Sequence, residues 1–166
     1  MSYLGNNTFR AGLAPWRAFN KAGSVATDIG NDDTAFSGTN FLRFQTSASG
    51  GSVAVDFVAQ QPIAGVSQGP QGGGELAGFT FPSSLFAQLW IRARPGFGPV
   101  SGTLAFWELG LARNEVNNPN TLFAVAFAWT PIALSIDLRG AGPTVRLEVY
   151  LDTLNAALDI GAVVIS

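Results

Sequence analysis

The residue types that carry most enzyme chemistry are missing from this chain. Its 166 residues include no histidine and no cysteine. This removes Ser-His-Asp and Cys-His nucleophiles, the usual zinc ligands and any disulfide bond. Eleven acidic residues remain, and a glycosidase needs only a pair of carboxylates. They are scattered, with Asp32 and Asp33 in a turn-like stretch and Glu108 beside Trp107. No acid–nucleophile pair is indicated, and we predict that the protein is not an enzyme.

A tryptophan with polar companions is the main functional signal. In FAQLWIRAR (86–94), alternation places Leu89 and Ile91 on one face of a strand and Gln88, Trp90 and Arg92 on the other. An indole stacks on the apolar C–H face of a sugar ring, while amide and guanidinium groups hydrogen-bond to its hydroxyls. This mixture favours a glycan-binding sheet face.

Two more aromatic residues extend this prediction. Trp107 has a similar position on the strand 101–112, and Tyr150 alternates with charged residues in 144–152. If the strands of Trp90 and Trp107 are neighbours, their indoles lie side by side. The alternative is that the Trp90 face is covered by the loop 62–78 or by another subunit, because Arg–Trp stacking is also ordinary packing. The predicted ligand-binding residues are Trp90, Gln88, Arg92, Trp107 and Tyr150.

Two loop motifs are weaker signals. GPQGGGE (69–75) is rich in glycine but lacks the Lys-Ser/Thr of a phosphate-binding loop, so a mobile loop is favoured. GNDDTAFSGTN (30–40) offers oxygen atoms for calcium, or it forms an acidic β-turn between strands. The turn is the favoured interpretation, and no cofactor is predicted.

Strand patterns dominate the sequence. Alternating apolar residues, interrupted by Gly, Pro, Asn and Ser, predict strands in 40–46, 50–58, 86–94, 101–112, 123–129, 144–152 and 157–166. In 123–129 the alternation places Phe127 and Trp129 on one face and predicts that Trp129 is core, while 62–74 forms a long loop. No stretch has a helical period. About 8–10 strands predict an all-β fold, a two-sheet antiparallel jelly-roll β-sandwich, as one domain over 1–166.

Several segments resemble one known family. NNTFRAGLAPW (6–16), FAQLWIRA (86–93), FAWTPIAL (127–134) and the closing stretch 143–166 are similar, in this order, to motifs of carbohydrate-binding-module-like jelly rolls. These are the galactose-binding-like sandwiches that include families 4, 9 and 22. The resemblance implies this fold, a non-catalytic glycan-binding role and a packing role for Trp16.

The resemblance also raises the question of a structural calcium ion. Those families often hold one between the N-terminal segment and the last strand, through a Glu and an Asp. Here Arg10 stands at the Glu position, and Asp159-Ile160-Gly161 replaces the acidic pair. Calcium needs six to eight oxygen ligands, so no metal is expected. An Arg10–Asp159 ion pair is the hypothesis for what joins the two segments.

Composition restricts the partners. Charged residues are 12% of the chain, about half the usual share, and no basic cluster suits nucleic acid. The longest apolar run (122–134) is too short to span a membrane and contains Pro131. No signal peptide is visible in MSYLGNNTF. The apolar share of 47% is high for so few charges, which suggests either surface covered by other protein subunits or a well-filled sandwich with an alanine-rich exterior.

Two functions remain open from the sequence. The first is a non-catalytic glycan- or polysaccharide-binding protein on an external surface, extracellular or on a virion. The alternative is a structural or decoration protein of a larger assembly, such as a virus capsid or tail, without a sugar site; a homo-oligomer fits this alternative. The two are compatible, because a decoration protein can also hold glycans.

Overall fold

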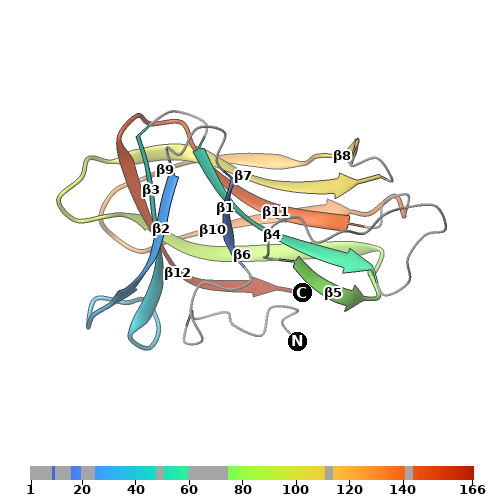
Figure 1. Ribbon diagram of the computed structural model, residues 1–166, viewed down its shortest axis with the longest axis horizontal. Helices are drawn as coiled ribbons and strands as arrows, with labels where there is room; N and C mark the ends of the chain where they lie inside the picture. Colours follow the sequence, from blue (N-terminus) through green and yellow to red (C-terminus); the bar gives the residue numbers. More distant parts are fainter. Residues whose placement is uncertain are drawn as a thin grey trace.

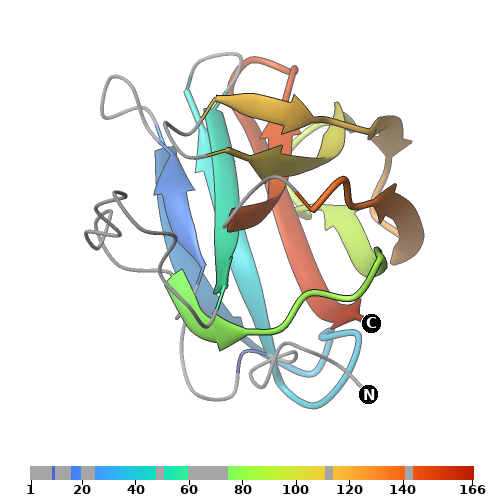
Figure 2. The ribbon, with the colours of Figure 1, turned by 90° about the vertical axis from the view of Figure 1, so that its right-hand side faces the viewer.

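A computed structural model shows the chain as two β-sheets packed against each other (Figures 1 and 2). It describes residues 9, 16–19, 25–47, 51–59, 75–110, 114–140 and 144–166. These residues form 12 strands and no helix. The strands are β1 (Arg17–Phe19), β2 (Val25–Asn31), β3 (Asn40–Thr46), β4 (Gly51–Ala59), β5 (Glu75–Phe79), β6 (Ser84–Ala93), β7 (Val100–Leu109), β8 (Glu115–Asn117), β9 (Asn120–Val125), β10 (Thr130–Asp137), β11 (Thr144–Leu151) and β12 (Ala156–Ile165).

Strands that are distant in sequence pair within each sheet. The larger sheet runs β1-β4-β11-β7-β8, with β5 also beside β4 and β9 also beside β7. The smaller sheet runs β10-β6-β12-β3-β2. All pairings except β4 with β5 are antiparallel. The consecutive strands β6 and β7 belong to different sheets, so the connection 94–99, with its Pro95 and Pro99, crosses from one layer to the other.

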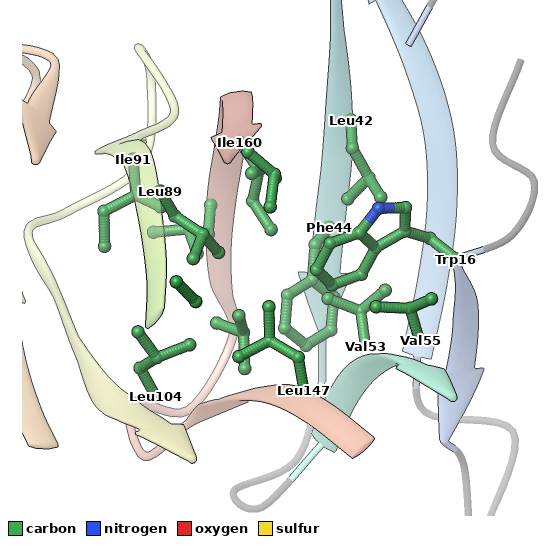
Figure 3. Packing of buried hydrophobic residues seen from close by; sticks show 14 of the residues in the cluster. Trp16, Leu42, Phe44, Val53, Val55, Leu89, Ile91, Leu104, Leu147 and Ile160 are labelled. Atoms are coloured by element: carbon green, nitrogen blue, oxygen red, sulfur yellow. The ribbon is translucent and has the colours of Figure 1, made fainter. Parts of the chain in front are cut away.

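The core lies between the two sheets. Leu89 and Ile91 on β6, with Ile160 on β12, point toward Leu104 on β7 and Leu147 on β11 (Figure 3). Each such side chain contributes about 1.5–3 kcal/mol when it is fully buried. This inward row leaves the alternate residues of every central strand on an outer face, and those residues carry the candidate chemistry.

Trp16 packs in the same core. It is 5% exposed and lies next to Leu42, Phe44 and Val55 in Figure 3. The packing role that the family resemblance implies for Trp16 is therefore confirmed.

The predicted architecture is also confirmed: the fold is an all-β sandwich of two sheets. Predicted strands 40–46, 50–58, 86–94, 101–112, 144–152 and 157–166 correspond to β3, β4, β6, β7, β11 and β12 within one to three residues at each end. The strand number exceeds the expected 8–10, and five strands, β1, β2, β5, β8 and β10, lie outside the predicted strand ranges.

The prediction for 123–129 is wrong in its second half. β9 ends at Val125, residues 126–129 interrupt the ladder, and β10 begins at Thr130 in the other sheet. Phe127 is 49% exposed, and Trp129 is half-buried on an outer face rather than in the core. The alternation could not continue because the chain changes sheets at this point, where the backbone N–H of Ala93 donates to the carbonyl of Ala126 (2.8 Å).

Candidate functional site

The outer face of the larger sheet combines two aromatic residues with buried charges. Register aligns Trp107 with Arg146, Ala105 with Glu148, and Thr103 with Tyr150 across β7 and β11, and β4 continues these rows. Alternation places all of them on the side away from the core. We call this the Trp107 surface; its members are Arg17, Ser52, Ala54, Asp56, Thr103, Ala105, Trp107, Arg146, Glu148 and Tyr150.

At one end of the Trp107 surface, two arginines hold one aspartate. Arg146 donates from Nε and Nη2 to the two carboxylate oxygens of Asp56 (2.6 and 3.0 Å), and Arg17 donates from Nη2 (2.8 Å). The Asp56 carboxylate is fully buried. Burial alone lowers the pKa of Arg146, but the hydrogen bonds to Asp56 and its charge outweigh this and raise the pKa above its ordinary value. The cluster is therefore a rigid, charge-assisted unit.

At the other end, Glu148 is held by two hydroxyl groups. Ser52 donates from Oγ to Oε1 of Glu148, and Tyr150 donates from its hydroxyl to Oε2 (2.7 Å). Burial raises the pKa of the Tyr150 phenol well above its ordinary value, and the hydrogen bond to Glu148 and its charge raise it further. Tyr150 thus stays a protonated donor at neutral pH.

Trp107 shares the row of Asp56 and Arg146, at the first of these two ends. Its side chain is half-buried, and it lies directly opposite Arg146. The indole N–H lowers the pKa of the Tyr150 hydroxyl, which partly offsets the increase caused by burial and by Glu148. Among the described residues this N–H has no hydrogen-bond partner. The row of Ala105 and Glu148, which are both buried, lies between the row of Trp107 and the row of Tyr150.

The condition for a side-by-side pair of Trp90 and Trp107, that their strands are neighbours, is not met. Trp90 is on β6 in the smaller sheet, whereas Trp107 is on β7 in the larger sheet. Both point away from the core, so the two indoles lie on opposite outer faces of the sandwich. Of the five predicted ligand-binding residues, the structure brings Trp107 and Tyr150 together on one face, and Trp90, Gln88 and Arg92 on the other.

Arg92 is engaged in internal contacts. Its Nε donates to Asp159 (3.1 Å), its Nη1 and Nη2 donate to the carbonyl and hydroxyl of Thr34 (3.1 and 2.9 Å), and its guanidinium stacks on Trp129 (4.4 Å). Arg94 adds a second ion pair to Asp159 (3.1 Å). The Arg92 side chain is 7% exposed, so this guanidinium packs against the protein rather than facing solvent.

The loop that covers this face is 32–39, the connection between β2 and β3 (blue to light blue in Figure 1). Phe36 stacks on Trp90 with ring centroids 4.7 Å apart, and it meets Trp129 edge-on at 6.1 Å. Trp129 donates from Nε1 to the carbonyl of Thr34 (2.8 Å). The expected covering segment was 62–78, but its last residues belong to β5 in the larger sheet, and residues 62–74 lie outside the described residues.

We call Phe36 of this loop, together with the part of the outer face next to it, the Trp90 surface. It comprises Phe36, Phe86, Gln88, Trp90, Pro131, Ala133, Ser135 and Val164, on the loop and on β6, β10 and β12. Trp90 and Gln88 are half-buried, while Phe36 and Phe86 are each 40% exposed.

The stretch 30–40 forms a connection between two antiparallel strands, as the turn interpretation expected. Asp32 accepts hydrogen bonds from the backbone and side chain of Thr34, and the side-chain bond is the main cause that lowers the pKa of Asp32. Within the part of the chain that the structure describes, no three His, Cys, Asp or Glu side chains gather in a way that could hold a metal ion.

Asp159, which the family resemblance suggested as a calcium ligand, accepts from Arg92 and Arg94. Arg10, its proposed partner, lies outside the described residues, as does the glycine-rich stretch 69–74. No helix among the described residues has the length and hydropathy to cross a membrane.

Sequence reasoning missed the polar partners on the Trp107 surface. Arg146 and Glu148 were recognised as outward-facing, but Asp56 and Ser52 were not connected with them. One signal was available: Asp56 interrupts an otherwise apolar strand, between Val55 and Phe57. A carboxylate at such a central position needs a cationic partner on the neighbouring strand.

No protein-family model matches the chain, and no curated protein matches it. Solved structures share its fold. The CBM22-1 xylan-binding domain of Paenibacillus barcinonensis Xyn10C has a TM-score of 0.67 and 13% identity, over 96% of this chain and 90% of that one. TmCBM61 in complex with β-1,4-galactotriose has a TM-score of 0.62 and 13% identity, over 100% of this chain and 98% of that one.

A third similar structure comes from a phage. The enzymatically active domain of bacteriophage CBA120 tailspike protein 4 has a TM-score of 0.69 and 9% identity, over 99% of this chain. This chain spans only 21% of that tailspike chain. The similarities to the two carbohydrate-binding modules confirm the expected resemblance to carbohydrate-binding-module-like sandwiches at the level of the fold.

Proposed function

We propose that this protein binds carbohydrate without catalysing a reaction and that the Trp107 surface holds the glycan. The observation that carries the proposal is the arrangement of Trp107 and Tyr150, which lie together on one outer face and flank a hydrogen-bonded carboxylate. Half-buried aromatic rings offer apolar faces to sugar rings, and the surrounding polar groups fix the orientation of hydroxyls. Carbohydrate-binding modules among the similar folds support the same class of ligand.

The charges of the Trp107 surface favour an uncharged glycan. Arg17 and Arg146 supply two positive charges, and Asp56 and Glu148 supply two negative ones. Because the four charges balance, the surface has no net attraction for an acidic sugar. We therefore expect binding to a neutral polysaccharide to change little with salt concentration.

The burial of the two carboxylates on the Trp107 surface favours binding over catalysis. A glycosidase needs one carboxyl group that delivers a proton and a second that attacks or activates water. Asp56 is fully buried between two guanidinium groups, and Glu148 is almost fully buried beneath two hydroxyl donors. Neither carboxylate faces a position where a glycosidic bond would lie.

Isothermal titration calorimetry against xylan and β-1,4-galactotriose, the ligands named for the similar structures, tests the proposal. Trp107→Ala should weaken binding by about tenfold or more, equivalent to ~1.4 kcal/mol. Trp90→Ala is the matched control, since it removes an indole from the opposite face, and it should leave affinity unchanged. Circular dichroism and thermal unfolding verify that both variants fold.

Two results would reject the site. Loss of binding in Trp90→Ala with retention in Trp107→Ala would move the glycan to Trp90 and Gln88. Failure of the wild-type protein to bind on a broad glycan array would reject carbohydrate binding altogether.

A second candidate function is a structural component of a virion. The similarity to the phage tailspike domain favours it, because that domain shows the same fold within a larger viral protein. On this proposal the protein is displayed on an external surface, where glycan binding remains useful. Capsid and tail genes beside its gene would support this candidate, whereas neighbouring glycoside hydrolase genes would support a free polysaccharide-binding module.

A further inference from the structure

Three asparagines lie close together where the chain passes from β8 to β9, and two of them have structural roles. Asn117 donates from Nδ2 to the carbonyl of Asp137 (2.9 Å), and Asn118 donates from Nδ2 to a carbonyl of β7 (2.7 Å). The third, Asn120, is the first residue of β9 and is exposed. Among the described residues its side chain has no hydrogen-bond partner. The carboxamide of Asn120 therefore holds neither the turn nor the strand in place.

Asn120 lies next to the Trp107 surface. Register places it directly opposite Ala105, a member of that surface. Phe123, three residues further along β9, is buried in the core, so alternation directs the Asn120 side chain outward. Trp107 is two residues from Ala105 on β7, which makes Asn120 and Trp107 diagonal neighbours. Long and aromatic side chains reach each other across this separation.

The orientation of Trp107 brings the two side chains toward the same row. Trp107 and Tyr150 are two rows apart, yet the indole N–H acts on the Tyr150 hydroxyl, so these side chains lean toward each other across the row between them. That row contains Ala105, which is 2% exposed, and Asn120 continues it onto β9. A sugar ring that stacks on Trp107 therefore has part of its rim within reach of the Asn120 carboxamide.

The polar groups at the centre of the Trp107 surface are already used within the protein. Its two carboxylates accept hydrogen bonds from two arginines at one end and from two hydroxyl groups at the other. The Tyr150 hydroxyl donates to Glu148, so its oxygen can only accept from a ligand. The indole N–H of Trp107 has no partner, but its nitrogen is buried. Asn120 differs, since it offers two N–H donors and a carbonyl acceptor at an exposed position.

We propose that Asn120 determines which sugar the Trp107 surface prefers, by hydrogen-bonding to a hydroxyl group on the rim of the sugar ring that stacks on Trp107. The inference rests on the proposed carbohydrate-binding function of this surface. Stacking on an indole is similar for any sugar with an apolar face, whereas a hydrogen bond depends on the position and direction of one hydroxyl group. Trp107 then supplies affinity for sugars in general, and Asn120 supplies the discrimination between neutral sugars that differ in their hydroxyl groups.

Isothermal titration calorimetry with a set of neutral β-1,4-linked trisaccharides tests the proposal. Xylotriose, cellotriose, mannotriose and galactotriose differ in the groups around the sugar ring. Asn120→Ala should weaken binding of the preferred ligand by roughly fivefold, the change expected for one neutral hydrogen bond, and should bring the affinities for the other ligands closer to it. Trp107→Ala should instead weaken all of them by a similar factor.

Two further variants separate the hydrogen bond from other effects. Asn120→Asp keeps the shape of the side chain and an acceptor but removes both N–H donors, so it should also reduce the preference among the ligands. Asn31→Ala is the matched control, because Asn31 is exposed at the end of β2 in the smaller sheet, and it should leave every affinity unchanged. Thermal unfolding verifies that each variant is folded.

The role of Asn120 and the proposed function fail in different ways. If Trp107→Ala loses binding while Asn120→Ala keeps the wild-type affinities, only the role of Asn120 is overturned. An equal loss for all ligands in Asn120→Ala would also overturn it, because recognition of one hydroxyl group must change the ranking of the ligands. If the wild-type protein binds no sugar on a broad glycan array, the proposed function is rejected and the role of Asn120 with it.

Discussion

Replacement of Asp159 by asparagine gives a sharp test of how the smaller sheet is held together. The Asp159 side chain is 1% exposed, and its two oxygens accept from Nε of Arg92 and Nε of Arg94, each at 3.1 Å. Asparagine keeps the shape of the side chain but removes the charge. Two guanidinium groups would then lie close together with no carboxylate between them.

The cost follows from the burial of each partner. Removal of one member of a buried ion pair destabilises a protein by about 3–5 kcal/mol. The loss here should be near the lower end, about 3 kcal/mol, because Arg92 keeps its hydrogen bonds to Thr34 and Arg94 is partly exposed. For a chain of this size that corresponds to a fall in Tm of roughly 6–12 °C.

Urea unfolding followed by tryptophan fluorescence measures the change in the free energy of unfolding. Asp137→Asn is the control, since Asp137 is exposed at the end of β10 and its replacement should change stability by less than about 0.5 kcal/mol. A loss of less than ~1 kcal/mol in the free energy of unfolding of Asp159→Asn is typical of a solvent-exposed ion pair. Such a result would contradict the inference that Asp159 holds Arg92 and Arg94 together on this outer face.

Two further outcomes are expected. The Tyr150 phenol should titrate well above its ordinary pKa of 10.0, because burial and Glu148 raise the pKa; its contribution to stability is then present below pH 10 and is lost as pH rises through the folded-state pKa. The absorbance difference between wild type and Tyr150→Phe in an alkaline titration measures this, and a transition near pH 10 would contradict it. Gly161→Ala should destabilise the fold by about 1–3 kcal/mol, because its Cβ would collide with Phe36 and Trp129. Gly98→Ala is the control in the same urea assay, since no atom lies within 4 Å of a Cβ there. Equal unfolding midpoints for the two variants would contradict this prediction, because they would show that the 32–39 loop moves to accommodate the added Cβ.

Local alternation was enough to predict most central strands. In β11, the inward Val145, Leu147 and Val149 alternate with outward Arg146, Glu148 and Tyr150, and the two sets have opposite polarity. A one-residue error would place charges in the core, so such a strand has only one acceptable orientation. The outward position of Trp107 and of Trp90 was predictable for the same reason.

The assignment of strands to sheets was not predictable from alternation. β6 and β7 are consecutive and both carry an outward tryptophan, but β6 pairs with β10 and β12 while β7 pairs with β9 and β11. Alternation describes the two faces of one strand and contains no information about its neighbours. The 32–39 loop over Trp90 was not predicted for a related reason. Phe36 is a single aromatic residue within a polar turn, and Trp90, on which it stacks, is more than 50 residues away in the sequence.

Each outer face is built around the same charge motif, and this explains why a tryptophan with polar neighbours is ambiguous in sequence. In the larger sheet, Asp56 lies opposite Arg146 in register and also binds Arg17. In the smaller sheet, Asp159 lies opposite Arg92 and also binds Arg94. Arg146 and Arg92 therefore each bind a carboxylate on the neighbouring strand even in the absence of a ligand.

The two faces differ in what lies above this motif. On the smaller sheet, Phe36 and Thr34 of the 32–39 loop contact Trp90 and Arg92 and cover part of that face. On the larger sheet, Trp107 and Tyr150 occupy the rows on either side of Glu148, and the Tyr150 hydroxyl donates to Glu148. A sugar ring needs an aromatic surface that is fixed before binding and polar groups whose orientation is already set. The Trp107 surface meets both conditions, which supports the proposal that a glycan binds there and not at Trp90, the residue with the more conspicuous sequence pattern.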